Sequence, residues 1–304
     1  MNNTRQALAD YEMPESGKTT REELLARIAQ VKRNQPPRTE ADNPDTQSPP
    51  QAPVIQPATL QDVMILGGDL GQRVDAKVHE LFPNIEAIRK VNYDPNSQLV
   101  QGSNPFYNVA VNMAFKAMGH KFRTASQADL ELARKKGTID LSGTYEDSSL
   151  VWRSNANPNE YLARNIDEEL KRHSISHQAG KAYVLPLYAL GLEKDSNSPE
   201  KLSFKLISPK AVFESPILMS PSGRYINSAN MNESRGLPNQ VYETDPSSEN
   251  RPLFTRNSGL SRLCLYRCLD VDSNYEYLAD SYSGGRVVYV SGEANAPKNS
   301  GGKA

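Results

Sequence analysis

The spacing of apolar residues predicts three helices between residues 106 and 173. Apolar side chains recur every three to four residues in the segments 106–118, 124–137 and 159–173, and Gly closes each of the first two. In the second segment, Thr124 or Ser126 stands where an N-terminal capping residue belongs. This period places the apolar side chains of a segment on one face, which is typical of a helix that packs on a core.

Beyond residue 180 the period changes to alternation, so 182–188, 202–207 and 212–218 are predicted strands. The apolar group 63–66 precedes two glycines and an amphipathic stretch, but it lacks the spacing of a phosphate-binding loop, and it predicts a strand, a turn and a helix. Residues 220–258 are rich in Ser, Asn, Pro and Gly and predict a long ordered loop region. Helices followed by strands favour an α+β fold.

The two ends of the chain differ from its middle. Residues 1–35 contain a short stretch with helical spacing, which predicts an N-terminal helical appendage. Residues 36–58 are Pro-rich and nearly free of large apolar side chains, so they predict an extended linker. Residues 297–304 are a Gly/Ser/Lys tail that we expect to be flexible.

The charge balance disfavours nucleic acid as a partner. The 304 residues carry 35 basic and 36 acidic side chains, with a net charge of −1 and no run of Lys or Arg. No apolar run approaches the roughly 18 residues that span a bilayer, so no membrane insertion is expected. No secretory signal is visible at the N-terminus, and the location is left open.

Residues that commonly bind metals or act in catalysis are few. His173 and His177 lie four apart without a carboxylate at a matching spacing, so we expect no metal site there. Cys264 and Cys268 lie in an alternating segment; on one strand their Cα atoms would be roughly 13 Å apart. A disulfide needs less than about 7 Å, so the bond is excluded unless the strand breaks at Arg267. We find no catalytic motif and expect no catalytic residue and no cofactor.

The stretch from residue 260 to 290 combines an apolar framework with an unusual set of intervening residues. The framework consists of Leu263, Leu265, Leu269, Val271, Leu278, Ala279, Val287, Val288 and Val290. The intervening residues, called the twelve positions below, are Cys264, Tyr266, Arg267, Cys268, Asp270, Asp272, Asn274, Tyr275, Tyr277, Asp280, Tyr282 and Gly284. They use six residue types, all of which arise from the asparagine codons AAC and AAT when only adenines change.

Together with the surrounding framework, this pattern resembles the variable proteins of diversity-generating retroelements of archaea and their viruses. The framework that runs from Ser258-Gly-Leu-Ser-Arg-Leu263 through Gly285-Arg-Val-Val288 to Glu293 is similar to an archaeal variable region. The scaffold of such proteins is also resembled by three earlier segments, "SNPFYNVAV", "NVAVNMAFKAMGHKFRTASQADLELARKKG" and "TIDLSGTYEDSSLVWRS". The resemblance covers about 60–293.

The resemblance implies that 59–296 is a C-type lectin-like domain, related to the formylglycine-generating enzyme, with a variable region at 258–293. It implies helices followed by a small twisted antiparallel sheet and long loops. In such systems, adenine-directed copying randomises the C-terminal segment of a ligand-binding protein. The twelve positions would then be ligand-binding, and the partner would be a protein or cell-surface ligand that differs between variants. The cysteine-based metal site of the enzyme branch and the calcium-binding motifs of animal lectins are missing.

A randomised surface has a physical requirement, which is that its variable side chains contribute little to folding. We therefore expect the framework to be buried and Tyr266, Tyr275, Tyr277 and Tyr282 to cluster on one exposed face. Replacing these four by Ser should then leave the melting temperature nearly unchanged and abolish ligand binding. Two alternatives are an enzyme of this fold with an unrecognised site, and a structural or attachment protein of a virus or cell envelope.

Overall fold

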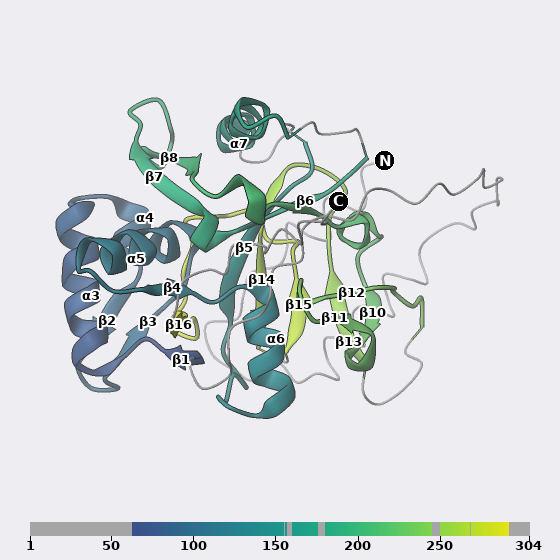
Figure 1. The fold of residues 1–304 in the computed structure, drawn as a ribbon, viewed down its shortest axis with the longest axis horizontal. Helices are drawn as coiled ribbons and strands as arrows, with labels where there is room; N and C mark the ends of the chain where they lie inside the picture. The colour runs from purple at the N-terminus through teal and green to yellow at the C-terminus, as the bar shows by residue number, and fades with distance from the viewer. Residues whose placement is uncertain are drawn as a thin grey trace, which may run out of the picture. The chain divides into compact units, whose positions relative to one another are not determined.

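The computed structural model describes residues 63–154, 156, 160–175, 180–244, 250–267 and 269–291. These residues all belong to one compact unit within 49–304 (Figure 1). The predicted appendage 1–35, linker 36–58 and tail 297–304 lie outside the described residues. Helices account for 31% of the described residues and strands for another 31%, which agrees with the predicted α+β class.

The predicted helices are present, but the single helix expected after residues 63–66 is two separate helices, α3 (Gly68–Leu81) and α4 (Glu86–Arg89). The others are α5 (Pro105–Ala117), α6 (Gln127–Lys136) and α7 (Glu160–Arg172). Of the two candidate caps for α6, Ser126 is the cap, and it forms a reciprocal pair of hydrogen bonds with Asp129. Gly137 ends this helix in the left-handed region, with φ of 64°. Asn104 caps α5 by accepting from the Tyr107 amide.

The largest sheet has seven strands in the order β10-β13-β15-β14-β5-β6-β9. Their bounds are β5 Glu146–Trp152, β6 Tyr183–Pro186, β9 Phe213–Glu214, β10 Arg224–Asn227, β13 Asn250–Phe254, β14 Leu260–Tyr266 and β15 Asp270–Asp272. All neighbours are antiparallel except β13 and β15, which are parallel. Strand β14 therefore lies inside the sheet, with β5 on one side and β15 on the other.

A second sheet joins the first and last described strands. It has the order β1 (Val63–Ile65), β16 (Val288–Ser291) and β4 (Phe122–Thr124). Three two-stranded ribbons complete the strands: β2 (Asn92–Asp94) with β3 (Leu99–Gln101), β7 (Leu190–Lys194) with β8 (Leu202–Leu206), and β11 (Met231–Asn232) with β12 (Leu237–Pro238). Figure 1 shows β1 and β16 beside each other, below α5.

The predicted order of elements is wrong in two respects. Strand β1 was predicted, but β2 to β5 lie between the helices and were not. Strands β2, β3 and β4 have three residues each, too few to show alternation, and β5 is buried on both faces and does not alternate. The region 220–258 contains β10 to β13 and is not simply a loop. Strand β13 was not predicted because it includes Arg251, a residue type that is usually exposed. Here Arg251 is buried, and its charge pairs with Glu131 at 3.0 Å.

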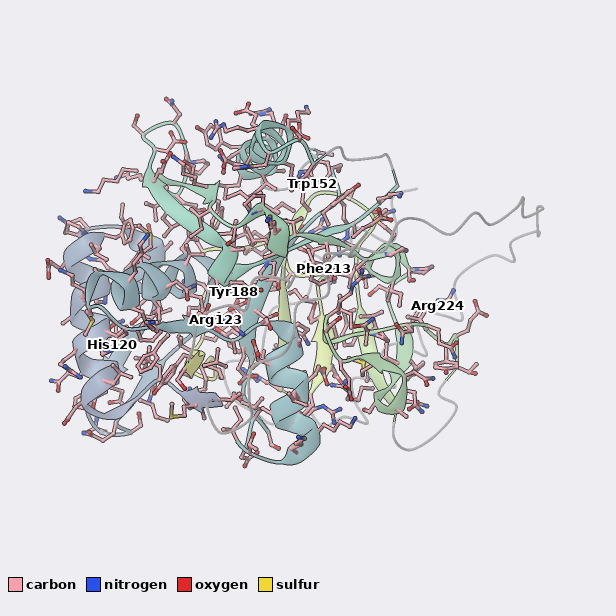
Figure 2. The ribbon with its side chains drawn as sticks, in the orientation of Figure 1. His120, Arg123, Trp152, Tyr188, Phe213 and Arg224 are labelled. Atoms are coloured by element: carbon pink, nitrogen blue, oxygen red, sulfur yellow. The ribbon has the colours of Figure 1, made fainter. Side chains whose placement is uncertain are left out.

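The elements are joined by a continuous interior. Helix α5 is buried along most of its length, and Trp152 of β5 donates from Nε1 to the Ala163 carbonyl of α7 at 2.9 Å. Arg123 of β4 binds Asp129 of α6 at 2.6 Å and lies over the ring of Tyr188 (Figure 2). Among the described helices, none is long and apolar enough to cross a membrane.

Candidate functional site

The predicted continuous strand over 263–272 is a hairpin. Strand β14 ends at Tyr266 and β15 begins at its partner Asp270, so three residues form the turn. Leu269 closes the turn in the left-handed region, with φ of 64°, as is common in hairpins of this length. Because it is part of the turn, Leu269 is half-buried, and the prediction of a buried Leu269 was wrong. Cys268 lies outside the described residues.

Both faces of β14 are buried, which corrects the expected division into an inner and an outer set. Leu263, Leu265, Val271, Val287 and Val288 are buried as predicted. The opposite face of β14 carries Arg262 and Cys264, which are also buried. The strand is interior to its sheet, and the irregular segment 273–287 contributes residues that cover its second face.

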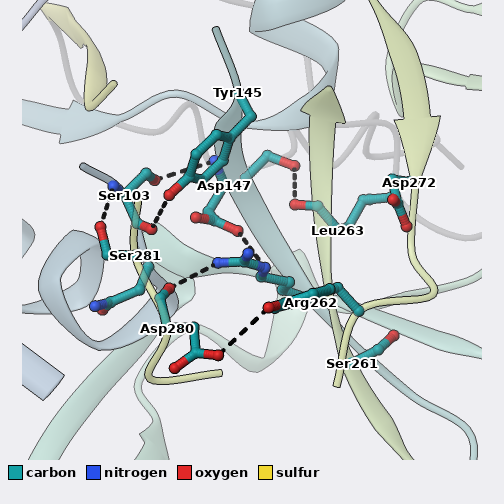
Figure 3. Close-up of polar contacts among 12 residues, drawn as sticks. Ser103, Tyr145, Asp147, Ser261, Arg262, Leu263, Asp272, Asp280 and Ser281 are labelled. Atoms are coloured by element: carbon teal, nitrogen blue, oxygen red, sulfur yellow. Dashed lines mark hydrogen bonds and ion pairs between the residues drawn. The ribbon is translucent and has the colours of Figure 1, made fainter. Parts of the chain in front are cut away.

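The segment 273–287, called the covering loop below, is held largely through its main chain. The Tyr145 hydroxyl donates to the Ser103 carbonyl at 3.1 Å and accepts from the Tyr282 amide at 2.8 Å (Figure 3). The Tyr145 amide donates to the Gly284 carbonyl at 3.2 Å, and the Arg286 amide donates to the Tyr145 carbonyl at 3.0 Å. Tyr145 thus fixes the second half of the covering loop.

Arg262 holds the first half in the same way. Its amide donates to the Tyr275 carbonyl at 3.1 Å, and its guanidinium donates to the Asp280 carbonyl at 3.0 Å. The guanidinium also lies 4.3 Å from the centre of the Tyr275 ring. Asn104 adds a donor to the Ala279 carbonyl at 3.3 Å. On the side of the loop, these hydrogen bonds use backbone carbonyls, which every residue type has. The contact with the Tyr275 ring is the exception.

A buried ion pair fixes Arg262 beneath the covering loop. Its Nε lies 3.5 Å from a carboxylate oxygen of Asp147 on β5, and both side chains are almost fully buried (Figure 3). Burial raises the pKa of Asp147, while the charge of Arg262 and a hydrogen bond with Ser103 lower it in part. No pattern in the sequence distinguishes Arg262, Asp147, Tyr145 or Ser103, although all four lie in the segments that carry the resemblance.

The structure divides the twelve positions by exposure. Arg267, Asn274 and Tyr277 are exposed; Tyr266, Asp272, Tyr275, Asp280, Tyr282 and Gly284 are half-buried; Cys264 and Asp270 are buried. The expectation that all of them face outward is therefore wrong for the last two. Cys264 lies between Asp147 and Asp272 on the neighbouring strands, and Asp270 starts β15 at the base of the hairpin.

The four tyrosines lie near one another, as predicted, but three of them are not exposed. The Tyr275 and Tyr282 hydroxyls are 2.6 Å apart, and the Tyr275 and Tyr277 ring centres are 5.8 Å apart. Tyr266 is linked to them through Tyr145, whose ring centre lies 6.3 Å away. Only Tyr277 is exposed, at 59%. Replacing all four by Ser would remove packed rings, so an unchanged melting temperature is expected for Tyr277 alone.

A pocket of about 220 Å³ opens beside Tyr277. It is lined by Glu86, Ala87, Lys90, Glu200, Tyr277, Leu278, Ala279 and Asp280. Lys90, the residue that follows α4, reaches Asp280 at 3.0 Å, so a side chain outside the variable region contacts one of the twelve positions. Partial burial raises the pKa of Glu200.

The structure offers no support for cysteine or metal chemistry within the described ranges. Burial, together with the charges of Asp272 and Asp147, raises the pKa of the Cys264 thiol, which keeps it protonated and weakly nucleophilic. Cys264 forms no disulfide. Among the described residues, no group of three or more His, Cys, Asp or Glu side chains is placed to hold a metal ion. His173 follows the end of α7, and His177 is outside the described residues.

Glu146, at the start of β5, makes stability depend on pH. Burial raises the pKa of its carboxyl to about 8, although Thr144 donates a hydrogen bond to it. Its folded pKa is above its unfolded one, so its ionisation costs stability as pH rises from about 4.5 towards 8. The free energy of unfolding of Glu146→Gln minus that of the wild type should rise by about 1.4 kcal/mol per pH unit in this window. Urea unfolding at pH 5, 6 and 7 measures it, and a constant difference would contradict the assignment.

Comparison with known proteins adds no relative: no family model, no curated protein and no solved structure matches this chain.

Proposed function

We propose that this chain is a ligand-binding variable protein of a diversity-generating retroelement, built on a C-type lectin fold, with the covering loop and the β14–β15 turn as its diversified surface. Its partner is a protein or cell-surface ligand that differs between variants. Nine of the twelve positions, the exposed and half-buried ones, supply this surface. The buried Cys264 and Asp270 influence it only through the scaffold.

The observation that carries the proposal is the way in which the covering loop is held. Tyr145, Arg262 and Asn104 bind carbonyl and amide groups of the loop, at Tyr282 and Asp280 among others. A change of side chain leaves such hydrogen bonds in place, because the backbone groups are common to all residues except the amide of Pro. The loop can therefore keep its conformation while its side chains change, which is what a diversified binding surface requires.

The residue types of this surface agree with a role in binding. Tyr provides large contact area at a small cost in conformational entropy, and Asn, Ser and Gly provide adaptable hydrogen bonding. Tyr277 is the one exposed aromatic ring among the described large apolar residues. Arg267, which follows β14, and Asn274, which follows β15, are also exposed. Tyr and Arg are among the residue types most enriched at binding hot spots.

The proposal is tested by sequencing the gene in many cells of one population together with its flanking DNA. We expect differences confined to the 258–293 coding region and concentrated at the codons of the twelve positions, each explained by a changed adenine, and a near-repeat of this region beside a reverse-transcriptase gene. The codons for Tyr145, Asp147 and Arg262 serve as the internal control and should be constant. Differences spread evenly over scaffold and loop, or a locus without the repeat, would refute the proposal.

A further inference from the structure

Four serines lie between residues 261 and 283, and the structure separates one of them from the others. Ser261 and Ser273 are buried and accept hydrogen bonds from the guanidinium of Arg153 at 2.9 and 2.7 Å. Ser281 accepts from the Ser103 amide at 3.0 Å. These three hydroxyls hold the scaffold together.

Ser283 has no such role. Its side chain is exposed, and its hydroxyl makes no hydrogen bond with any residue in the described ranges. Its carbonyl accepts from the Arg286 guanidinium at 2.7 Å, a contact that any residue at this position can make. Ser283 also lies between Tyr282 and Gly284, which are two of the twelve positions.

The tip of the loop, residues 282–284, is attached at both ends to one point of the scaffold. On one side, Ser281 binds the Ser103 amide. On the other side, Gly285 lies so close that an added Cβ would be 2.4 Å from the same Ser103 nitrogen. The residues on both sides of the tip are thus held against Ser103, and the side chain at position 283 between them is exposed.

We propose that Ser283 is a further diversified position whose side chain contacts the ligand, an inference that rests on the proposed function. Serine belongs to the same codon set as the other positions, because AAC becomes AGC by one adenine change. Residue type alone does not distinguish this serine from the scaffold serines. The distinction comes from the hydrogen bonds of Ser261, Ser273 and Ser281 and from the exposure of Ser283.

Display of the full chain on yeast tests the inference. Position 283 is randomised together with the nine exposed and half-buried positions, and binders are selected against biotinylated lysozyme as a model protein probe. Returning residue 283 to Ser in selected clones is expected to weaken binding by about tenfold. The matched control changes Ile207, an exposed residue of the β7–β8 region, to Ser in the same clones and should leave affinity unchanged.

A second pair of libraries tests whether the fold tolerates substitution at position 283, separately from whether this side chain contacts the ligand. Randomising position 281 alone should remove most chains from the folded, protease-resistant population, whereas randomising position 283 alone should leave that population nearly complete.

If selected clones bind but reversion at 283 changes affinity less than twofold, the inference is overturned and the proposed function stands. If the library yields no binder at all, the proposed function fails, and the inference fails with it.

Discussion

Gly285→Ala is expected to lower the free energy of unfolding by about 3 kcal/mol, the upper part of the range for overpacking a tight site. A Cβ at this position would be 2.4 Å from the Ser103 nitrogen, 2.6 Å from the Gly102 carbonyl carbon and 2.7 Å from the Tyr145 ring. Two of these atoms belong to backbone, so the clash is relieved only by moving the loop. Urea unfolding measures the loss.

Gly284→Ala is the matched control, one residue away in the same turn. Its Cβ would meet the Arg267 guanidinium at 3.7 Å and the Gly143 carbonyl oxygen at 3.8 Å, which are ordinary contacts. We expect a change within about 0.5 kcal/mol. Equal losses for the two variants would contradict the assignment of Gly284 as variable and Gly285 as scaffold. The contrast matters because the proposal requires neighbouring glycines to differ in tolerance.

Replacing Arg262 is expected to have the second large effect. Arg262→Met leaves the Asp147 carboxyl buried without its ion pair and should cost about 3–5 kcal/mol. It also removes the guanidinium donor to the Asp280 carbonyl, so amide hydrogen exchange in the covering loop should accelerate. Loss of the Arg262 charge raises the pKa of Asp147 above its value in the wild-type fold, so the destabilisation relative to the wild type should increase once pH exceeds that wild-type folded pKa.

Two comparison variants separate the ion pair from the loop contact. Arg262→Met combined with Asp147→Leu removes both charges and should recover much of the stability, while exchange in the covering loop stays fast. Arg164→Met on α7 breaks an exposed ion pair with Glu160 and should change stability by less than about 1 kcal/mol. A single Arg262 variant as stable as the wild type would show that the pair does not hold this part of the fold.

The local signals that sequence carries were sufficient for the helices. Capping residues and helical spacing act within a few residues, so they predicted α5, α6 and α7 close to their observed bounds. The apolar positions Leu263, Leu265 and Val271 were also predicted to be buried, because an alternating set of large apolar residues has to face an interior. The restriction of the twelve positions to six residue types is likewise a property of sequence alone.

The tertiary structure decided what lies on the other face of β14. Strand β5, with the sequence "EDSSLVW", is buried throughout although its first four residues are polar. Three of these residues have polar partners from other parts of the fold: Glu146 binds Thr144, Asp147 binds Ser103 and Arg262 of β14, and Ser148 binds Gln127 of α6. Burial of Cys264 and the role of Arg262 depend on β14 being interior to the sheet, a long-range pairing that periodicity does not encode. Sequence thus indicated which positions are candidates for variation, and only packing determined which of them are exposed.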